Sequence, residues 1–335
     1  MTAAALQLTR LLADPARASQ VRDWTAIMSA ARAESLAGTL ARRLAGMTVP
    51  PEVERIFEDA RRASATVATE ALWEAEMARR ALAPLGVPVI LLKGTAYAAA
   101  GLPPAQGRSI GDLDILVPRD ALPRVEQALL AAGWEWVKED PYDDLYYRRW
   151  MHELPPLIHR ERDRMIDAHH TILPLTAKPT PDSAALVADS VALASGLRIL
   201  APADMIVHAA AHLIADGDLA GGLRNLWDID RLLRGFAERD EGFFAMLQAR
   251  AERHGLWRAV HRAARLASDL YATPIPESWR VWDGADPLFR ARLLARDGWG
   301  RQTRAALRFG FYARSHLLRM PPLMLARHLL TKARR

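Results

Sequence analysis

Residues 87–117 constrain the fold of this chain more than any other stretch. They begin with an almost continuous apolar run over 87–92, which is typical of a strand buried on both faces of a sheet. A Lys93-Gly94-Thr95 turn, a short helix and a loop rich in proline and glycine follow, and a second strand is predicted over 112–117. The sequence therefore predicts two core strands that are joined by a helix and a loop.

Two acidic residues, Asp112 and Asp114, open the second of these strands. Because successive side chains of a strand point to opposite faces, the two carboxylates share one face and Leu113 lies on the other. Neighbouring like charges are tolerated at an exposed strand end or where a cation neutralises them. The pattern indicates a divalent metal site; the alternative is that the aspartates only protect an exposed strand start.

The turn between the two strands has the features of an anion site. Gly94 allows close backbone approach, and the free N–H groups of the helix that follows favour a negative charge. Lys93 adds a full positive charge beside them. A phosphate site next to a metal site suggests a nucleotide, although Gly94 alone is explained as well by an ordinary turn.

The spacing of apolar residues divides the 335-residue chain into three regions. Residues 1–85 are expected to be an N-terminal helical region that covers one side of the sheet, with a long helix over about 52–85. Residues 86–175 are predicted to form the nucleus of the fold, which contains the sheet. Residues 176–335 are predicted to form a C-terminal helical domain with a basic tail, and no strand is predicted beyond Pro181. Besides the two core strands, strands are predicted at 134–137, 146–150, 154–159 and 165–173.

Composition narrows the chemistry further. The chain contains no cysteine, so a metal would be held by carboxylates, histidines or water, and a cytoplasmic location is expected. No signal peptide or membrane span is predicted. The net charge of +6 favours a polyanionic partner. After Asp297 every charged side chain is basic, so the tail is expected either to contact RNA or an anionic membrane, or to be a solvated face.

Three segments, taken in order, resemble the motifs of a known family. They are LLKGT at 91–95, RSIGDLDILV at 108–117 and IDAHH at 166–170. Together they resemble the uncharacterised nucleotidyltransferase family of the polymerase-β-like superfamily. The resemblance implies an α+β fold, in which a mixed sheet is flanked by N-terminal and C-terminal helical regions. It also implies that Asp167 lies beside the strand of Asp112 and Asp114.

The resemblance implies roles for individual residues. Asp112, Asp114 and Asp167 would be the catalytic carboxylates and would hold Mg²⁺ or Mn²⁺. The nucleotide, ATP or another NTP, would be bound by Lys93, Gly94, Thr95, Arg108 and His169. The implied reaction moves an NMP from the NTP to a hydroxyl or phosphate of a small molecule, glycan or peptide natural product. Thr95 replaces the usual serine, and the gap between Thr95 and Asp112 is longer than usual.

Three other functions fit parts of the sequence. A protein that kept the fold could bind a nucleotide without catalysis, and an RNA-directed transferase would suit the basic charge. A metallohydrolase could use His208 and His212, which have the helical spacing of a zinc ligand pair, but the glutamate of an H-E-x-x-H motif is missing, so the favoured interpretation is that both histidines line the interface between the helical bundle and the sheet. Asp228 and Asp230 are two residues apart on a predicted helix and face differently, so they make a poor metal pair. The family resemblance implies a supporting role for them, in which they fix the helical domain against the active site.

Overall fold

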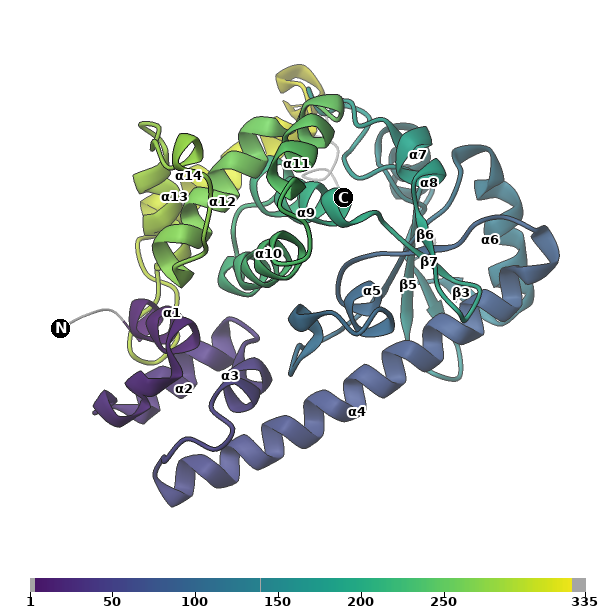
Figure 1. The fold of residues 1–335 in the computed structure, drawn as a ribbon. Helices are drawn as coiled ribbons and strands as arrows, with labels where there is room; N and C mark the ends of the chain where they lie inside the picture. Colours follow the sequence, from purple (N-terminus) through teal and green to yellow (C-terminus); the bar gives the residue numbers. More distant parts are fainter. Residues whose placement is uncertain (1–3, 139, 327–335) are drawn as a thin grey trace.

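A seven-stranded mixed sheet lies at one end of the molecule, and helices from both ends of the chain build the rest (Figure 1). The computed structural model describes residues 4–138 and 140–326. The strand order is β3-β4-β5-β2-β1-β7-β6. The strands are β1 (Ile90–Leu91), β2 (Leu113–Leu116), β3 (Trp134–Trp136), β4 (Leu157–His159), β5 (Met165–His169), β6 (Val191–Ala192) and β7 (Arg198–Ile199). The predicted α+β class with a mixed sheet and flanking helices is confirmed.

The centre of the sheet fixes the relative position of distant residues. β2 is antiparallel to β1 and parallel to β5. In the parallel pair, Asp114 lies opposite Asp167. All four residues of β2 are buried, which explains why three of them are apolar and makes the buried carboxylate of Asp114 exceptional.

The long helix α4 (Pro51–Leu82) runs from the N-terminal helices to the sheet (Figure 1). Pro51 occupies its first position, where the missing N–H costs nothing, and Glu52 and Glu54 complement the positive end of the helix dipole. The helix contacts α5 (Lys93–Ala99), α6 (Leu122–Ala131) and β2. The predicted long helix is therefore confirmed, and it is the part of the N-terminal region that covers the sheet.

The first three helices do not cover the sheet, contrary to expectation. They are α1 (Ala4–Ala13), α2 (Trp24–Ala33) and α3 (Ala37–Arg43). α1 packs on α12 (Trp257–Tyr271), more than 240 residues away along the chain, and Arg296 Nε forms an ion pair of 2.8 Å with Glu34. The sequence pattern could not show this, because it predicts the apolar face of a helix but not the partner of that face.

Two glycines bring α3 against the loop that precedes Arg108. A Cβ on Gly38 would lie 2.5 Å from the carbonyl oxygen of Gly107, and a Cβ on Gly107 would collide with the backbone of Gly38. Gly107 also has a φ of +71°, which favours glycine. The two backbones can approach this closely only because neither residue has a side chain.

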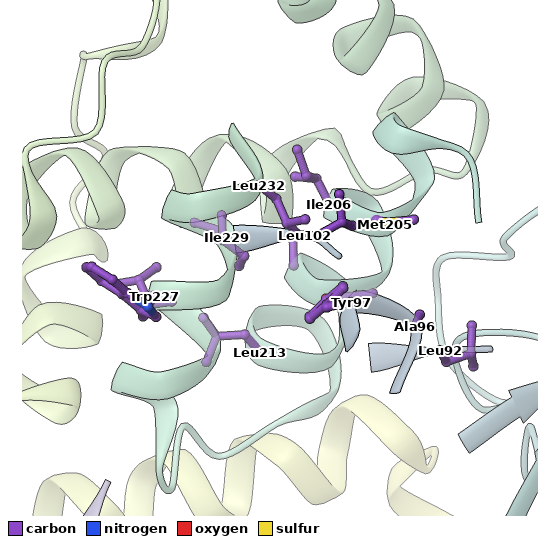
Figure 2. Packing of buried hydrophobic residues seen from close by; sticks show 14 of the residues in the cluster. Leu92, Ala96, Tyr97, Leu102, Met205, Ile206, Leu213, Trp227, Ile229 and Leu232 are labelled. Carbon is purple, nitrogen blue, oxygen red and sulfur yellow. The ribbon is translucent and has the colours of Figure 1, made fainter. Parts of the chain in front are cut away.

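The C-terminal helices pack on the short helix that follows β1. α9 (Pro202–Ala210) and α10 (Gly222–Ala237) lie over α5 and the loop after it. Figure 2 shows Tyr97 and Leu102 of this segment in one apolar cluster with Ile206 of α9 and Ile229 of α10. The helical region thus holds the segment between β1 and β2 in place.

Two predictions of secondary structure are wrong. Residues 146–150 are not a strand but the end of α7 (Pro141–Trp150), because Asp140 caps the helix by accepting hydrogen bonds from the N–H groups of Tyr142 and Asp143. The region after Pro181 is not purely helical, since β6 and β7 form a hairpin that adds to the sheet through β1. Both strands have only two residues, too few to produce a recognisable alternation.

The remaining helices are α8 (Ser183–Ala188), α11 (Phe243–Arg253), α13 (Asp286–Leu293) and α14 (Ala305–Arg319). Throughout the described part of the chain, each helix is too short or too polar to cross a membrane. Four of the basic residues of the tail, Arg327, Lys332, Arg334 and Arg335, lie outside the described residues. Among the described residues of the tail, Arg314 does not belong to a purely solvated face, because its guanidinium donates to the carbonyl oxygen of Ile214 at 2.6 Å.

Candidate active site

Two neighbouring strands bring three carboxylates together. Asp112 directly precedes β2, Asp114 lies within it, and Asp167 lies opposite Asp114 on β5. Oxygen atoms of the three side chains all lie within 4.8 Å of one another. The structure therefore brings together the three acidic residues that the sequence singled out, although Asp114 and Asp167 are 53 positions apart, because parallel pairing of β2 and β5 places them at the same end of the sheet.

Asp114 is held by two basic side chains. Lys93 Nζ donates to its Oδ1 at 2.6 Å, and His169 Nε2 lies 3.0 Å from the same oxygen. Burial alone would raise the pKa of Asp114, but Lys93 and His169 outweigh burial and hold the pKa well below its usual range. Asp114 is thus a fully ionised carboxylate in a buried position.

Lys93 makes this contact from an unusual backbone conformation. Its φ is +48°, in the left-handed region that costs a non-glycine residue roughly 1–2 kcal/mol. The residue opens α5 directly after β1, and this geometry accompanies the contact of its ammonium group with Asp114. Strained backbone of this kind is frequent at functional sites.

His169 links two carboxylates. Its Nε2 lies 3.0 Å from Asp114, and its Nδ1 lies 3.2 Å from Oε2 of Glu153. Burial would lower the pKa of His169, but the hydrogen bond to Asp114 and the charge of Glu153 raise it. His169 therefore favours the imidazolium form, which can donate from both ring nitrogens.

Asp167 differs from Asp114 in its surroundings. Its Oδ1 is buried and has no hydrogen-bond partner among the described residues. Burial, together with the carboxylates of Glu153 and Asp114, raises the pKa of Asp167 to about 7. A buried, unpartnered oxygen beside two further carboxylates fits a hard divalent cation such as Mg²⁺, which would supply the missing partner.

A cavity of about 220 Å³ opens beside these carboxylates. Lys93, Asp112 and Asp114 line one side of it, and Arg108 lies on another. The guanidinium of Arg108 is buried and donates from Nε to Oδ2 of Asp228 at 2.9 Å. Burial would lower the pKa of Arg108, but Asp228 raises it, so a permanent positive charge faces the cavity.

The structure places Gly94 and Thr95 differently. Gly94 lines the cavity, and a Cβ there would collide with Nη1 of Arg108, so the close approach that this glycine allows is made by Arg108. Thr95 is only 1% exposed and lines a small recess beside Ala71 and Glu74 of α4. Thr95, which matches the family's motif, therefore does not line the cavity.

The opposite wall of the cavity comes from the helical region, and the sequence did not predict it as part of the site. It includes His208, His212, Arg224, Asn225 and Asp228. His212 lies in a π-helical turn, Ala211–Asp216, that continues α9. Such turns are rare and frequent at functional sites. The signal available in the sequence was the His208-His212 spacing, which predicts two side chains on one helix face.

The histidine pair does not form a metal site in this structure. Among the described residues, two groups have the spacing of metal ligands, and neither includes His208 or His212. Burial and the nearby Lys93 lower the pKa of His208, so it lines the cavity as a neutral side chain, whereas His212 is exposed. The second group consists of His152, Glu153 and His169, in which Glu153 and His169 already contact each other.

Asp228 and Asp230 have the separate surroundings that their spacing predicted. Asp228 pairs with Arg108, and its Oδ1 is buried without a partner among the described residues. Asp230 instead accepts hydrogen bonds from Arg234 and Thr273, away from the cavity. The supporting role expected for Asp228 agrees with its ion pair with Arg108, which holds the guanidinium of Arg108 in place.

Comparison with known sequences agrees with this geometry. No curated protein matches the chain. The sequence model of a family described as uncharacterised nucleotidyltransferase matches residues 20–272, which is most of the chain and includes both walls of the cavity. The resemblance of the three motifs is thereby confirmed: the chain belongs to the uncharacterised nucleotidyltransferase family.

Proposed function

We propose that the protein is a metal-dependent enzyme that transfers an NMP from an NTP to an acceptor. The family supports nucleotidyl transfer in general. The observation that carries the specific reaction is the cluster of Asp112, Asp114 and Asp167 beside a cavity lined by basic side chains. Carboxylates that can hold a divalent cation, next to cations that can neutralise a polyphosphate, are what phosphoryl-group chemistry requires.

In this proposal the three carboxylates hold Mg²⁺ or Mn²⁺. When bound, the metal supplies charge neutralisation at the α-phosphate and lowers the pKa of the acceptor hydroxyl. The residues fit this role because Asp167 Oδ1 lacks a partner among the described residues and Asp114 is fully ionised. His169 orients Asp114 and keeps it charged.

In the proposed reaction, side chains of the protein act both on the acceptor and on the leaving pyrophosphate. The carboxylate of Asp167 accepts the proton of the acceptor hydroxyl, whose oxygen then bonds to the α-phosphorus. The bond from the α-phosphorus to the bridging oxygen breaks, and pyrophosphate leaves. Lys93 and Arg108 neutralise the charge that develops on the leaving group, and the backbone at Gly94 contacts its phosphates. Thr95 supports this turn from its buried position.

The acceptor is proposed to be a small molecule, a glycan or a peptide natural product, as the resemblance implies. RNA is the second candidate, favoured by the net charge of +6. Contact of the basic tail with RNA or with an anionic membrane, and a cytoplasmic location, stay predictions from the sequence. A protein that binds nucleotides without catalysis is the alternative that the experiment must exclude.

Thermal unfolding with each of the four NTPs, with and without Mg²⁺ or Mn²⁺, tests binding. We expect stabilisation that requires metal and disappears in Asp112→Ala, with Asp120→Ala as a matched control on an exposed carboxylate. Pyrophosphate release from α-labelled NTP in an extract of the source organism, with transfer of the label to a product, then tests catalysis. Binding without release in any extract would favour the non-catalytic alternative, and stabilisation by Zn²⁺ that is lost in His208→Ala would favour a hydrolase.

A further inference from the structure

A second cavity, of about 300 Å³, adjoins the first. His212 and Asn225 line both cavities and form the wall between them. The far side of the second cavity is formed by α14, through Tyr312, Ser315 and His316. The two cavities are therefore direct neighbours on either side of His212 and Asn225.

The second cavity is built from two segments that are held together by an arginine. Arg314 of α14 donates to the carbonyl oxygen of Ile214, which lies in the π-helical turn. The same guanidinium reaches the carbonyl oxygen of Gly217 at 3.4 Å. These contacts fix α14 against the turn that carries His212, so the cavity has defined walls.

The two cavities differ in chemistry. The first is lined by three cationic side chains, which are Lys93, Arg108 and Arg224, and by three carboxylates, of which Asp112 and Asp114 are proposed to hold the metal. The second combines rings and an amide: Tyr312 and His316 lie edge to face with their centroids 4.5 Å apart, and Asn225 offers an amide group. Its one arginine, Arg319, is accompanied by the carboxylate of Asp218.

The side of the second cavity that is formed by the rings of Tyr312 and His316 is accessible and has a polar atom without a hydrogen-bond partner among the described residues. Tyr312 is 52% exposed, so one face of its ring is available to a ligand. His316 Nδ1 is buried and has no hydrogen-bond partner among the described residues. Aromatic and imidazole rings stack on nucleobases, and amide groups can donate to and accept from a base edge.

We propose that the second cavity binds the nucleoside of the NTP, with the base on the ring of Tyr312 and the triphosphate in the first cavity. An NTP consists of an anionic triphosphate and an uncharged ring system. The cationic side chains and proposed metal ligands of the first cavity suit the triphosphate, and the rings of the second cavity suit the base. Asn225, at the junction, is placed to contact the base or the sugar. This inference rests on the proposed function, and the competing occupant of the second cavity is the acceptor.

Binding of two probes separates these occupants. Each of the four NTPs, and inorganic tripolyphosphate, is titrated with Mg²⁺ present and without acceptor, against the full-length protein and three variants. Tyr312→Ala removes the ring and Tyr312→Phe keeps it. Phe309→Ala is the matched control, because Phe309 is 71% exposed on the same helix and lines neither cavity. Circular dichroism and thermal unfolding establish that each variant is folded.

We expect Tyr312→Ala to weaken the best-bound NTP about tenfold, as is typical for loss of a stacking ring, and to leave tripolyphosphate within about twofold. Tyr312→Phe and Phe309→Ala should bind both probes as the unaltered protein does. Unchanged NTP affinity in folded Tyr312→Ala would overturn the inference and leave the cavity to the acceptor. Equal weakening of both probes would also overturn it, because the ring would then act on the phosphate site.

Failure of the proposed function gives a different result. In that case the unaltered protein binds neither the NTPs nor tripolyphosphate, and the nucleoside assignment is overturned with it. If tripolyphosphate binds as tightly as every NTP, the phosphate site stands and only the nucleoside cavity is refuted.

Discussion

The two walls of the active-site cavity are held in place by different forces. The strand wall consists of Asp112 and Asp114, which line the cavity, together with Asp167 and His169 beside them on β5, and it is fixed by backbone hydrogen bonds between β2 and β5. The helical wall, which consists of His208, His212, Arg224, Asn225 and Asp228, is fixed by side-chain packing and by the ion pair of Asp228 with Arg108. A sheet register positions atoms more rigidly than side-chain packing does.

This difference suggests a division of labour between the walls. In the proposed reaction, chemistry at the α-phosphate requires carboxylates held to within fractions of an ångström, and strand pairing can provide that precision. Binding of the proposed polyphosphate and nucleoside would tolerate small adjustments of the helical wall. We therefore expect changes in the strand wall to lower turnover, and changes in the helical wall to lower affinity or stability.

The largest effect is expected for Asp114→Asn in the strand wall. It removes the charge that both Lys93 and His169 contact, and with it one of the three proposed metal ligands. Loss of a residue that only orients a metal ligand already lowers metal affinity or activity about 10–100-fold. Loss of a proposed ligand itself should therefore lower kcat by more than about 100-fold. Asp120→Asn is the control. If Asp114→Asn keeps near-normal turnover while folded, the strand wall does not perform the chemistry.

In the helical wall, Asp228→Ala is expected to destabilise the fold by about 3–5 kcal/mol, since it leaves the buried charge of Arg108 unpaired. Urea unfolding measures this change. The double variant Arg108→Met/Asp228→Leu removes both charges and should recover most of the stability while losing NTP affinity. Stability that stays low in the double variant would mean that packing, and not the unpaired charge, causes the loss.

The pKa of Asp167 predicts a pH-dependent effect of intermediate size. Because the folded-state pKa is raised from 3.8 to about 7, the folded protein holds the proton more tightly than the unfolded chain, so ionisation of Asp167 lowers stability as the pH rises through this range. Without divalent metal, Asp167→Asn should be more stable than the unaltered protein by on the order of 3 kcal/mol at pH 8.

Denaturant unfolding in EDTA at several pH values tests this prediction. The difference between Asp167→Asn and the unaltered protein should shrink as the pH falls and vanish below about pH 4, near the ordinary pKa of the group. Added Mg²⁺ should stabilise the unaltered protein but not the variant. A difference that is independent of pH would show that Asp167 is not the group whose ionisation destabilises the strand wall.

The smallest effect is expected for Arg224→Ala in the helical wall. Arg224 Nε is buried without a hydrogen-bond partner among the described residues, and the side chain lines the cavity. Removing one charged hydrogen-bond donor to a phosphate should raise KM for the NTP about tenfold and leave kcat within about twofold. Arg239→Ala, at an exposed position beyond α10, is the control. A fall in kcat alone would contradict the division between the walls.

Much of the strand wall could be predicted from the sequence. The alternation of β2 places Asp112 and Asp114 on one face, and the family motifs imply that Asp167 joins them; the structure brings the three together. The roles of these residues stay predictions. The long helix and the fold class were also predictable, since a long apolar periodicity and an ordered set of motifs carry strong signals.

The helical wall could not be predicted in the same way. Arg108 and Asp228 are 120 positions apart, and their pairing depends on how α10 packs over α5, which no local pattern encodes. The turn that presents His212 is a local departure from α-helical geometry with no clear sequence signature. At α7, the aromatic residues favoured a strand, but the capping of the helix by Asp140 decided the outcome.

The facing glycines of α3 and the loop before Arg108 have a practical consequence. Shortened versions of the protein that begin after Gly38 would retain every acidic ligand and still lose the surface that seats this loop. Arg108 follows Gly107 directly, so the arginine that we propose to neutralise substrate charge depends on a segment that contributes no side chain to the cavity. We therefore expect backbone fit near position 38, well before the first strand, to set the boundary of the smallest fragment that keeps the proposed activity.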